Sequence, residues 1–591
     1  MPGGLRRYEF IMTDSLQNIW HNSFWTQGNS PPQTDVEGLQ NALYSLNQPL
    51  ILVDQNGQPA AATGGSMTIE LTGIGANRSP ADALVLATRA LTGDCCPLSV
   101  QDKRSTVNGQ RSTVLAFTPP LPPENLGDTE FKKRHNLRYA YVGGAMANGI
   151  TSTAMVEALG KAGMMGFYGA AGLTLTEVEK AIYEVQQKLG DSPYGFNLIH
   201  SPGDPDLEDA LVDLYIKQGI RKVCASAYLN LTPALVRYRV SGIYQDNQGN
   251  ILCPNQVVAK VSREEVAQRF FSPPPEKFLM QLIKDNTLTQ QQAELARHVP
   301  MADSLTAEAD SGGHTDNRPA ISLLPTLIAL RNEMVKTHRY PQSIPVGLGG
   351  GIGTPHAAAA AFSMGAAYIL TGSVNQACVE AGTSEAVRRL LAEARQADVA
   401  MAPAADMFEM GVKVQVLKRG TMFAQRATKL YELYTSYNQL EDIPEKLRIQ
   451  LERDVFKRSL DDEWRQTKAY FLQLDPRQVD RAEIDPRHKM ALVFRSYLGQ
   501  SSRWATTGHP DRKMDYQIWC GPTMGAFNAW VRGSFLEKPE NRDTVTVAMN
   551  LLFGACVLTR ANWVRCQGVA LPSHIDTYSP LPLNTIVKYM Q

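Results

Sequence analysis

The sequence lacks an excess of charge of either sign. Its 591 residues include 58 Lys and Arg and 58 Asp and Glu, so the formal net charge is zero. Proteins that bind nucleic acid carry a basic excess or a basic stripe, and this balance argues against nucleic acid as a partner. Hydrophobic residues (43%) and charged residues (20%) occur at fractions usual for a folded protein, which excludes wholesale disorder.

Cysteine and histidine are scarce and lack the spacing of metal ligands. The eight cysteines form no C-x-x-C pair, and the ten histidines show neither H-E-x-x-H nor H-x₃-H. We therefore expect buried, reduced thiols, no disulfide framework and no metal ion.

We also expect neither a secretory leader nor a membrane-spanning run. Met1 to Phe10 contains two arginines but no apolar stretch after them. The most apolar run, Val545 to Leu558, is short of the roughly 20 residues that cross a bilayer. We expect a cytoplasmic protein that has no membrane partner.

The length predicts three or four domains, or one large barrel with additions. Residues 1–137 read as an N-terminal α/β region, with a strand at 50–53, a turn at 54–57, an apolar helix at 81–91 and a proline-rich connector at 119–123. Residues 138–420 are expected to form a barrel. Residues 421–591 are expected to be a mainly helical C-terminal region, with helices at 385–397 and 442–460 flanking its start.

Eight short apolar segments alternate with helical patterns between residues 138 and 380. The strands are expected at 140–143, 164–168, 194–199, 221–226, 256–261, 304–309, 344–348 and 367–371. Helices are expected at 153–163, 175–190, 207–219, 262–271, 323–337 and 355–363, another opens at Thr232-Pro233, and a hairpin interrupts the repeat at 244–250. Continuous apolar strands are typical of a parallel sheet covered by helices. The fold class is therefore α/β, and a TIM (β/α)₈ barrel fits better than the alternative, an open doubly wound sheet.

Four tryptophans gather beyond residue 500, namely Trp504, Trp519, Trp530 and Trp563. They form either an aromatic core or a contact surface, and the core is the favoured interpretation.

Two glycine-rich turns follow the seventh and eighth strands, where a barrel binds its ligands. The first, Gly347 to Pro355, includes Gly350, Gly351 and Gly353 and leads into a helix; the second contains Gly372 and Ser373. Glycine lets the main chain approach an anion, and a helix N-terminus directs N–H groups at it. We expect a phosphate site here; the alternative is a pair of tight turns.

Residues suited to binding or catalysis lie in or directly after four other strands. Gly312 and Gly313 precede His314 after the sixth strand, and we expect this imidazole to transfer a proton. Lys260 lies in the fifth, apolar strand, where it either faces a ligand or forms a buried salt bridge. Asn197 is a polar residue in the third strand, and Met146, after the first strand, is placed to pack against a flat ring.

These motifs resemble the FMN-dependent barrel of nitronate monooxygenases and flavin-type enoyl-acyl-carrier-protein reductases. Three longer strings resemble more narrowly the trans-acting enoyl reductases of polyunsaturated fatty acid and polyketide synthases. They are the segments 308–319 (EADSGGHTDNRP), 349–376 and 518–528 (IWCGPTMGAFN).

The resemblance implies a cofactor, a reaction and partners. FMN would lie at the barrel mouth with its phosphate on Gly351, Gly353, Gly372 and Ser373, while Asn197, Lys260, Glu308, Gly312 and Gly313 would surround its ring. NADPH or NADH would reduce it, and an enoyl thioester on an acyl carrier protein would be the substrate. His314 would donate or organise the proton for the α-carbon. A homodimer is a further implication.

Three other functions stay open. A nitronate monooxygenase would use the same flavin site, with His314 as a base. A phosphate-sugar or nucleotide isomerase would use the barrel without flavin. A non-catalytic scaffold in a synthase complex is the alternative of another class.

Overall fold

The computed structural model of the chain describes residues 23–26, 31–62, 66–69, 98–99, 111–201, 205–572, 575 and 577–591. The chain forms two compact units. One comprises Gly127–Ala548, and the other combines Met1–Leu126 with Met549–Gln591.

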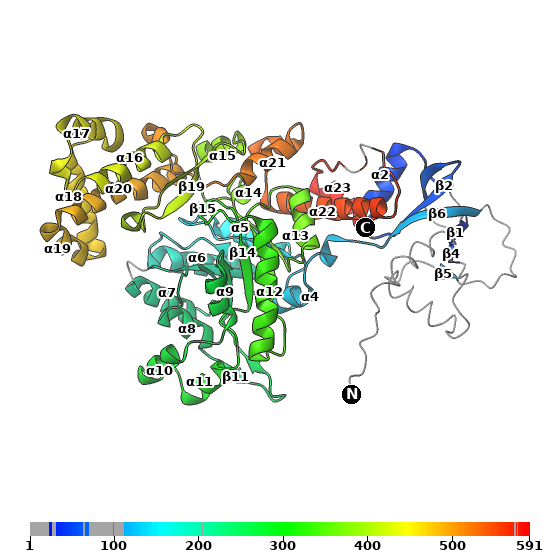
Figure 1. Cartoon of the computed structure of the whole chain (residues 1–591), viewed down its shortest axis with the longest axis horizontal. Coiled ribbons are helices and arrows are strands. Elements are labelled where there is room, and N and C mark those ends of the chain that lie inside the picture. The colour runs from blue at the N-terminus through cyan, green and yellow to red at the C-terminus, as the bar shows by residue number, and fades with distance from the viewer. Residues whose placement is uncertain are drawn as a thin grey trace, which may run out of the picture. The chain divides into compact units, whose positions relative to one another are not determined.

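The larger unit contains a closed barrel of parallel strands. One of them, β14 (Ser304–Glu308), is labelled in Figure 1. In ring order the strands are β7 (Tyr141–Gly143), β8 (Met165–Tyr168), β9 (Tyr194–Ile199), β10 (Lys222–Ser226), β13 (Gln256–Val261), β14 (Ser304–Glu308), β16 (Val346–Gly349) and β17 (Ile369–Thr371). β17 pairs with β7 and closes the ring, with Ile369 opposite Tyr141. The expected TIM barrel is confirmed, and each expected strand is present within two residues of its bounds at either end.

Helices follow the strands of the barrel. They are α5 (Thr153–Lys161), α6 (Leu175–Leu189), α7 (Pro205–Lys217), α8 (Pro233–Val240), α9 (Glu264–Phe271), α12 (Ala320–His338), α13 (Pro355–Ser363) and α14 (Ser373–Gln376). The additions are the expected hairpin β11 (Tyr244–Gln245) and β12 (Ile251–Leu252), with α10 (Glu276–Lys284) and α11 (Gln290–Ala296). Local sequence sets their starts: Thr174 and Glu177 form a capping box at α6, and Thr354 caps α13 ahead of Pro355.

A short helix, α4 (Thr129–His135), packs at the N-terminal end of the barrel strands. The ring of Phe131 is fully buried and stacks on that of Tyr368, with centroids 4.1 Å apart. The N–H of Asp128 donates to the carbonyl of Ala367, just before β17. The helix α4 therefore covers this end of the barrel, and the opposite end, where the strands have their C-termini, is the one at which such barrels bind ligands.

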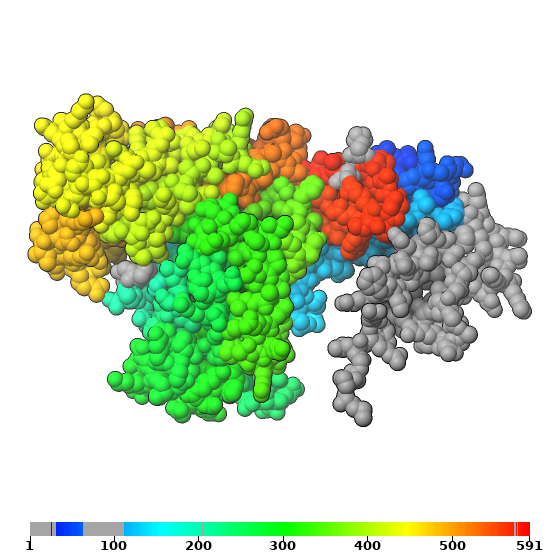
Figure 2. All heavy atoms as spheres, in the orientation of Figure 1, coloured from blue at the N-terminus to red at the C-terminus, as the bar shows by residue number. Residues whose placement is uncertain are grey.

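A small sheet and a helical lobe complete the larger unit. The sheet contains β15 (Gly313–His314), β19 (Lys413–Leu417) and β18 (Val399–Pro403), and α15 (Glu385–Ala392) and η2 (Phe408–Met410) flank β18. The helical lobe, residues 423–515, contains α16 (Phe423–Ser436), η3 (Leu440–Asp442), α17 (Glu445–Leu451), η4 (Glu452–Phe456), α18 (Leu460–Leu474), α19 (Pro476–Ile484), α20 (Pro486–Thr507) and η5 (Pro510–Asp515). Then follow α21 (Thr523–Val531), η6 (Phe535–Glu537) and η7 (Pro539–Asn541). The lobe is the compact group of mostly yellow atoms in Figure 2.

The smaller unit combines the two ends of the chain. Its strands are β1 (Ser23–Thr26), β2 (Leu50–Gln55), β3 (Gln58–Ala62), β4 (Ser66–Ile69), β5 (Leu98–Ser99) and β6 (Arg111–Thr118), and its helices are α2 (Val36–Tyr44), η1 (Pro123–Asn125), most of α22 (Thr544–Cys566) and α23 (Leu583–Tyr589). Arg560 of α22 is fully buried and donates to the carbonyls of Leu43, Ser45 and Gln48.

These bonds explain why the domain division differs from the expected one. We expected residues 421–591 to be one region, but its end joins the N-terminal residues. A buried guanidinium needs acceptors for its N–H groups, and residues 43–48 supply them. The helix α22 is also longer than the apolar run in the sequence. It has 23 residues and is long and apolar enough to cross a membrane, but 89% of its apolar 18-residue stretch is buried inside the protein.

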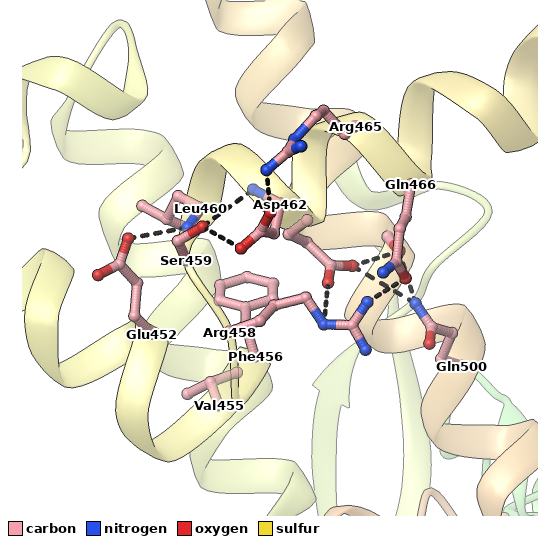
Figure 3. Close-up of polar contacts among 12 residues, drawn as sticks. Glu452, Val455, Phe456, Arg458, Ser459, Leu460, Asp462, Arg465, Gln466 and Gln500 are labelled. Atoms are coloured by element: carbon pink, nitrogen blue, oxygen red, sulfur yellow. Dashed lines mark hydrogen bonds and ion pairs between the residues drawn. The ribbon is translucent and has the colours of Figure 1, made fainter.

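The expected helix at 442–460 is interrupted. After α17 the chain makes a π turn and then places Lys457 in the left-handed region (φ +63°) before α18 begins. Side chains hold this break: Glu452 accepts from the N–H of Leu460, and Ser459 accepts from the N–H of Asp462 (Figure 3). The helix expected at 385–397 ends early, at Ala392. The helix expected at 81–91 lies outside the described residues.

The expected tryptophan core is only partly formed. Trp504 and Trp519 are partly buried against the core of the lobe, Trp530 is also partly buried, and Trp563 is exposed by 37%. All six cysteines among the described residues are free thiols, four of them buried.

Removing the ring of Phe131 tests the importance of the covered barrel end. Phe131→Ala is expected to lower the free energy of unfolding by about 3–5 kcal/mol, because it leaves a cavity against Tyr368. Urea denaturation followed by circular dichroism would measure this. The control is Tyr183→Ala, whose ring is 66% exposed and whose loss is expected to cost little. Equal destabilisation by both variants would contradict the packing role of Phe131.

Candidate functional site

A hollow that is open to solvent lies at the C-terminal ends of the barrel strands, where barrels of this kind bind their ligands. The lining comes from four groups of residues: Gly144, Ala145 and Met146 after β7; Lys260, Glu308, Ser311 and Gly312; Gly349, Gly350, Gly351 and Ile352 with Leu370, Thr371, Gly372, Ser373 and Gln376; and Trp519 and Thr523.

The two glycine-rich turns meet at this hollow, as expected. Gly350 and Gly351 have positive φ angles of +83° and +78°, which glycine adopts without strain. A Cβ atom added to Gly351 or Gly372 would meet no atom within 4 Å, so both face open space. Ser373 Oγ accepts from the N–H of Gly521, 3.1 Å away, which leaves its own O–H to donate to a ligand.

Lys260 and Glu308 form an ion pair at the wall of the hollow. Lys260 Nζ lies 2.6 Å from Glu308 Oε1, and both side chains are less than a fifth exposed. Burial alone would lower the pKa of Lys260, but the charge and the hydrogen bond of Glu308, with a contribution from Cys224, together outweigh burial and raise that pKa above its usual value. Lys260 therefore forms the salt bridge that was one of its two expected roles, and its side chain also lines the hollow.

The turn after β14 is fixed by main-chain contacts and one glutamine. The Gln415 side chain, on β19, donates to Asp310 Oδ1 at 2.8 Å and to the carbonyl of Ser311 at 2.7 Å. A Cβ atom on Gly312 would lie 2.8–3.0 Å from the main chain of Cys520. The close approach at Gly312 is thus made to Cys520, which the sequence did not indicate.

His314 lies two residues beyond the lining, on β15. Its Nε2 is 3.2 Å from Asp406 Oδ1, and the imidazole is 35% exposed. Burial alone would lower the pKa of His314, but the hydrogen bond and the charge of Asp406 raise it above the usual value. The same contact keeps the pKa of Asp406 below its usual value, against the effect of burial. The contact with Asp406 therefore favours the protonated form of His314.

Besides His314, three expected site residues do not line this hollow. Asn197 is buried, accepts from Ser226 Oγ at 3.1 Å and has its carbonyl bonded to the Tyr215 hydroxyl. Gly353 is covered by Thr523, since an added Cβ atom would lie 2.5 Å from Thr523 Cγ2. Gly313 lies on β15 next to His314, with a φ of +81°.

Sequence reasoning missed several residues that the fold brings here. Trp519 and Thr523 line the hollow, and the only signal for them is the resemblance of the string 518–528. Asp406 follows two alanines and carries no motif at all. Among the described residues, no group of three His, Cys, Asp or Glu side chains is arranged to hold a metal ion.

The chain belongs to the nitronate monooxygenase family, whose model matches residues 130–433. Residues 437–516, most of the helical lobe, match the inserted helical domain of acyl-carrier-protein S-malonyltransferase. The barrel with its small sheet and most of the lobe therefore match separate family models.

Individual relatives come from polyketide and fatty acid synthesis. The chain is 47% identical to the polyketide biosynthesis protein PksE of Bacillus subtilis over 77% of this chain and 58% of PksE. It is 46% identical to a polyunsaturated fatty acid synthase component of Thraustochytrium sp. over 78% of this chain and 31% of that component. Thus it spans less than two thirds of these relatives' length.

A solved structure matches nearly in full. The enoyl reductase domain of MlnA, from the macrolactin biosynthesis cluster of Bacillus amyloliquefaciens, is 40% identical. The match covers 76% of this chain and 99% of that domain, with a TM-score of 0.71. The family model and this domain are both named for oxidoreductases.

Breaking the ion pair on one side tests its energetics. Glu308→Gln is expected to destabilise the protein by about 3–5 kcal/mol, because Lys260 is left as a buried charge without its partner. The double variant Lys260→Met, Glu308→Gln is expected to recover most of this loss, measured by urea denaturation. The matched control is Glu385→Gln, which breaks the exposed pair with Arg389 (both side chains 64% exposed) and is expected to cost at most about 1 kcal/mol. Additive losses in the double variant would contradict the pairing.

Proposed function

We propose that this protein is an FMN-dependent enoyl reductase that reduces the α,β-double bond of enoyl thioesters on an acyl carrier protein. It would act in trans in polyunsaturated fatty acid or polyketide synthesis. The observation that carries the proposal is the match to the MlnA enoyl reductase domain along 99% of that domain. The synthase relatives and the expected hollow at the barrel mouth support it.

The residues at the hollow fit FMN. Gly351 and Gly372 leave room where a side chain would block a phosphate, and Ser373 has a hydroxyl proton to offer. Ser311 Oγ is buried beside the hollow without a hydrogen-bond partner, and such a group calls for a ligand atom. Gly351, Gly372 and Ser373 would hold the phosphate, and Met146 and Lys260 would lie by the ring.

FMN would supply the hydride for the β-carbon, after reduction by NADPH or NADH. The chain's own residues bind, orient and protonate. Lys260, held protonated by Glu308, places a positive charge where negative charge develops during reduction. His314, whose protonated form the carboxylate of Asp406 stabilises, would give a proton to the α-carbon, which completes the saturated thioester.

The helical lobe supports the choice of partner. Its match to a domain inserted in acyl-carrier-protein S-malonyltransferase supports a role beside an acyl carrier protein. We therefore propose the carrier-bound thioester, rather than the free acid, as the substrate.

A nitronate monooxygenase remains the second candidate, because the family model carries that name. It would use the same cofactor and His314 as a base. The two functions differ in what reoxidises the reduced protein, and the test below uses that difference.

A side chain at Gly372 is expected to block the cofactor. Gly372→Val would fill the open space in front of this turn, so FMN affinity is expected to fall at least tenfold while the fold is kept. Fluorescence titration of FMN into the cofactor-stripped protein would measure it. Gly499→Val is the matched control, since Gly499 also faces open space but lies on α20, outside the hollow. Unchanged FMN affinity in Gly372→Val would remove this turn from the cofactor site.

The decisive experiment follows the absorption of the purified protein under anaerobic conditions. We expect flavin bands that bleach with NADPH or NADH and return when a carrier-bound crotonyl thioester is added. Bands that only oxygen or a nitronate restores would replace the proposal with the monooxygenase. A protein that stays colourless after incubation with FMN would overturn the flavin enzyme altogether.

A further inference from the structure

The catalytic histidine of the proposed reaction is held by one nitrogen only. Its Nε2 contacts Asp406 Oδ1 at 3.2 Å, so Nδ1 is the nitrogen that can give up a proton to a substrate. Main-chain pairing fixes the histidine itself, since His314 stands opposite Val414 across β15 and β19. The orientation of the ring therefore depends on where Asp406 is held.

Asp406 lies in the connection between β18 and η2, and neighbouring groups fix its carboxylate. The N–H groups of Asp406 and Met407 bond to the carboxylate and help to lower its pKa. Arg495, on α20 of the helical lobe, binds the same connection. Its Nε donates to the carbonyl of Ala405 at 2.9 Å, and its Nη1 donates to Glu409 at 3.1 Å.

We infer that Asp406 is the positioning residue of the proton donor, and that Arg495 of the helical lobe holds Asp406 in place. This inference rests on the proposed function for the identity of the reaction. The step it serves balances simply: an N–H bond of the His314 imidazolium breaks, a C–H bond forms at the α-carbon, and solvent returns the proton to the neutral imidazole. Asp406 accepts a hydrogen bond throughout and does not touch the substrate.

Three charged groups act on His314, from three elements. Asp406 and Glu308 favour the imidazolium, and Lys260 opposes it. Because Lys260 and Glu308 pair at 2.6 Å, their opposite charges partly cancel at His314. Asp406 is the one of the three in direct contact with the imidazole, so it is the group whose loss is expected to change the pKa of His314 most.

The first test measures the titration of His314 directly, without turnover. Full-length protein labelled with ¹³C at histidine Cε1 is titrated by NMR, and His314→Gln identifies the resonance. We expect a pKa above the usual 6.5 in the wild type and a fall of about one unit in Asp406→Asn. The sign follows from charge: without the carboxylate the imidazolium is less stable, so it loses its proton at a lower pH.

The second test measures turnover against pH in the flavin-loaded enzyme. Loss of the raised pKa is expected to move the basic limb of kcat to lower pH, so that Asp406→Asn loses about tenfold at pH 8 and little at pH 5.5. Bleaching by NADPH is expected to be unchanged. Asp406→Glu should recover part of the loss, and Glu294→Gln, which removes a carboxylate from the exposed pair with His298, should change nothing.

Arg495→Met tests the support from the lobe. It keeps the apolar part of the side chain but removes both donors, and we expect a smaller shift of the His314 resonance in the same direction as Asp406→Asn. A His314 titration unchanged in Asp406→Asn, or a loss equal at all pH values, would overturn the positioning role. If the enzyme fails to reduce an enoyl thioester while the NMR titration shifts as expected, the proposed function fails but the Asp406–His314 pairing stands.

Discussion

The hydrogen-bonded closure of the barrel, β17 against β7, is the constraint on which the site depends. The register of this pair, Ile369 opposite Tyr141, places the first and last strand ends at one rim. The seam is reinforced inside the protein, where the Tyr141 hydroxyl lies 2.6 Å from Thr371 Oγ1 and 3.0 Å from Asn375 Oδ1. The turn with Gly372 and Ser373 begins directly after Thr371. Closure therefore sets where the two glycine-rich turns lie, because all parallel strands end on the same side.

The chain leaves the C-terminal end of the barrel to form the helical lobe and then returns to it. The leaving and the returning segments contact each other. The chain leaves through β19 and comes back at Ile518, whose carbonyl accepts from the N–H of Leu417 at 2.8 Å. The returning segment then packs its main chain against Gly312, and the N–H of Gly521 reaches Ser373. The lobe is thus anchored at the walls of the hollow, and its Arg495 holds the connection that carries Asp406. A partner bound to the lobe would sit on an element that is continuous with the site.

Much of the barrel could be predicted from the sequence. Strands such as β9 and β13 appear at their expected bounds, because a buried parallel strand requires an uninterrupted apolar run. The glycine turns and His314 could be placed at the rim for the same reason. The prediction of one continuous helix over 442–460 was wrong. Side chains of Glu452 and Ser459 stabilise a break by bonding to residues several positions away, and hydrophobic periodicity does not reveal such bonds.

The sequence alone determined the fold class, the rim residues and the resemblance to flavin barrels, since these depend on local patterns and on motifs with fixed spacing. Tertiary structure decided which residues meet. Gly312 has no room for a side chain because the main chain of Cys520, far along the sequence, lies against it. Lys260 is paired because Glu308 stands on the neighbouring strand, and His314 has a carboxylate because the small sheet brings Asp406 to it. Contacts between distant segments leave no periodic trace in a single sequence, and only the closed fold brings these residues together.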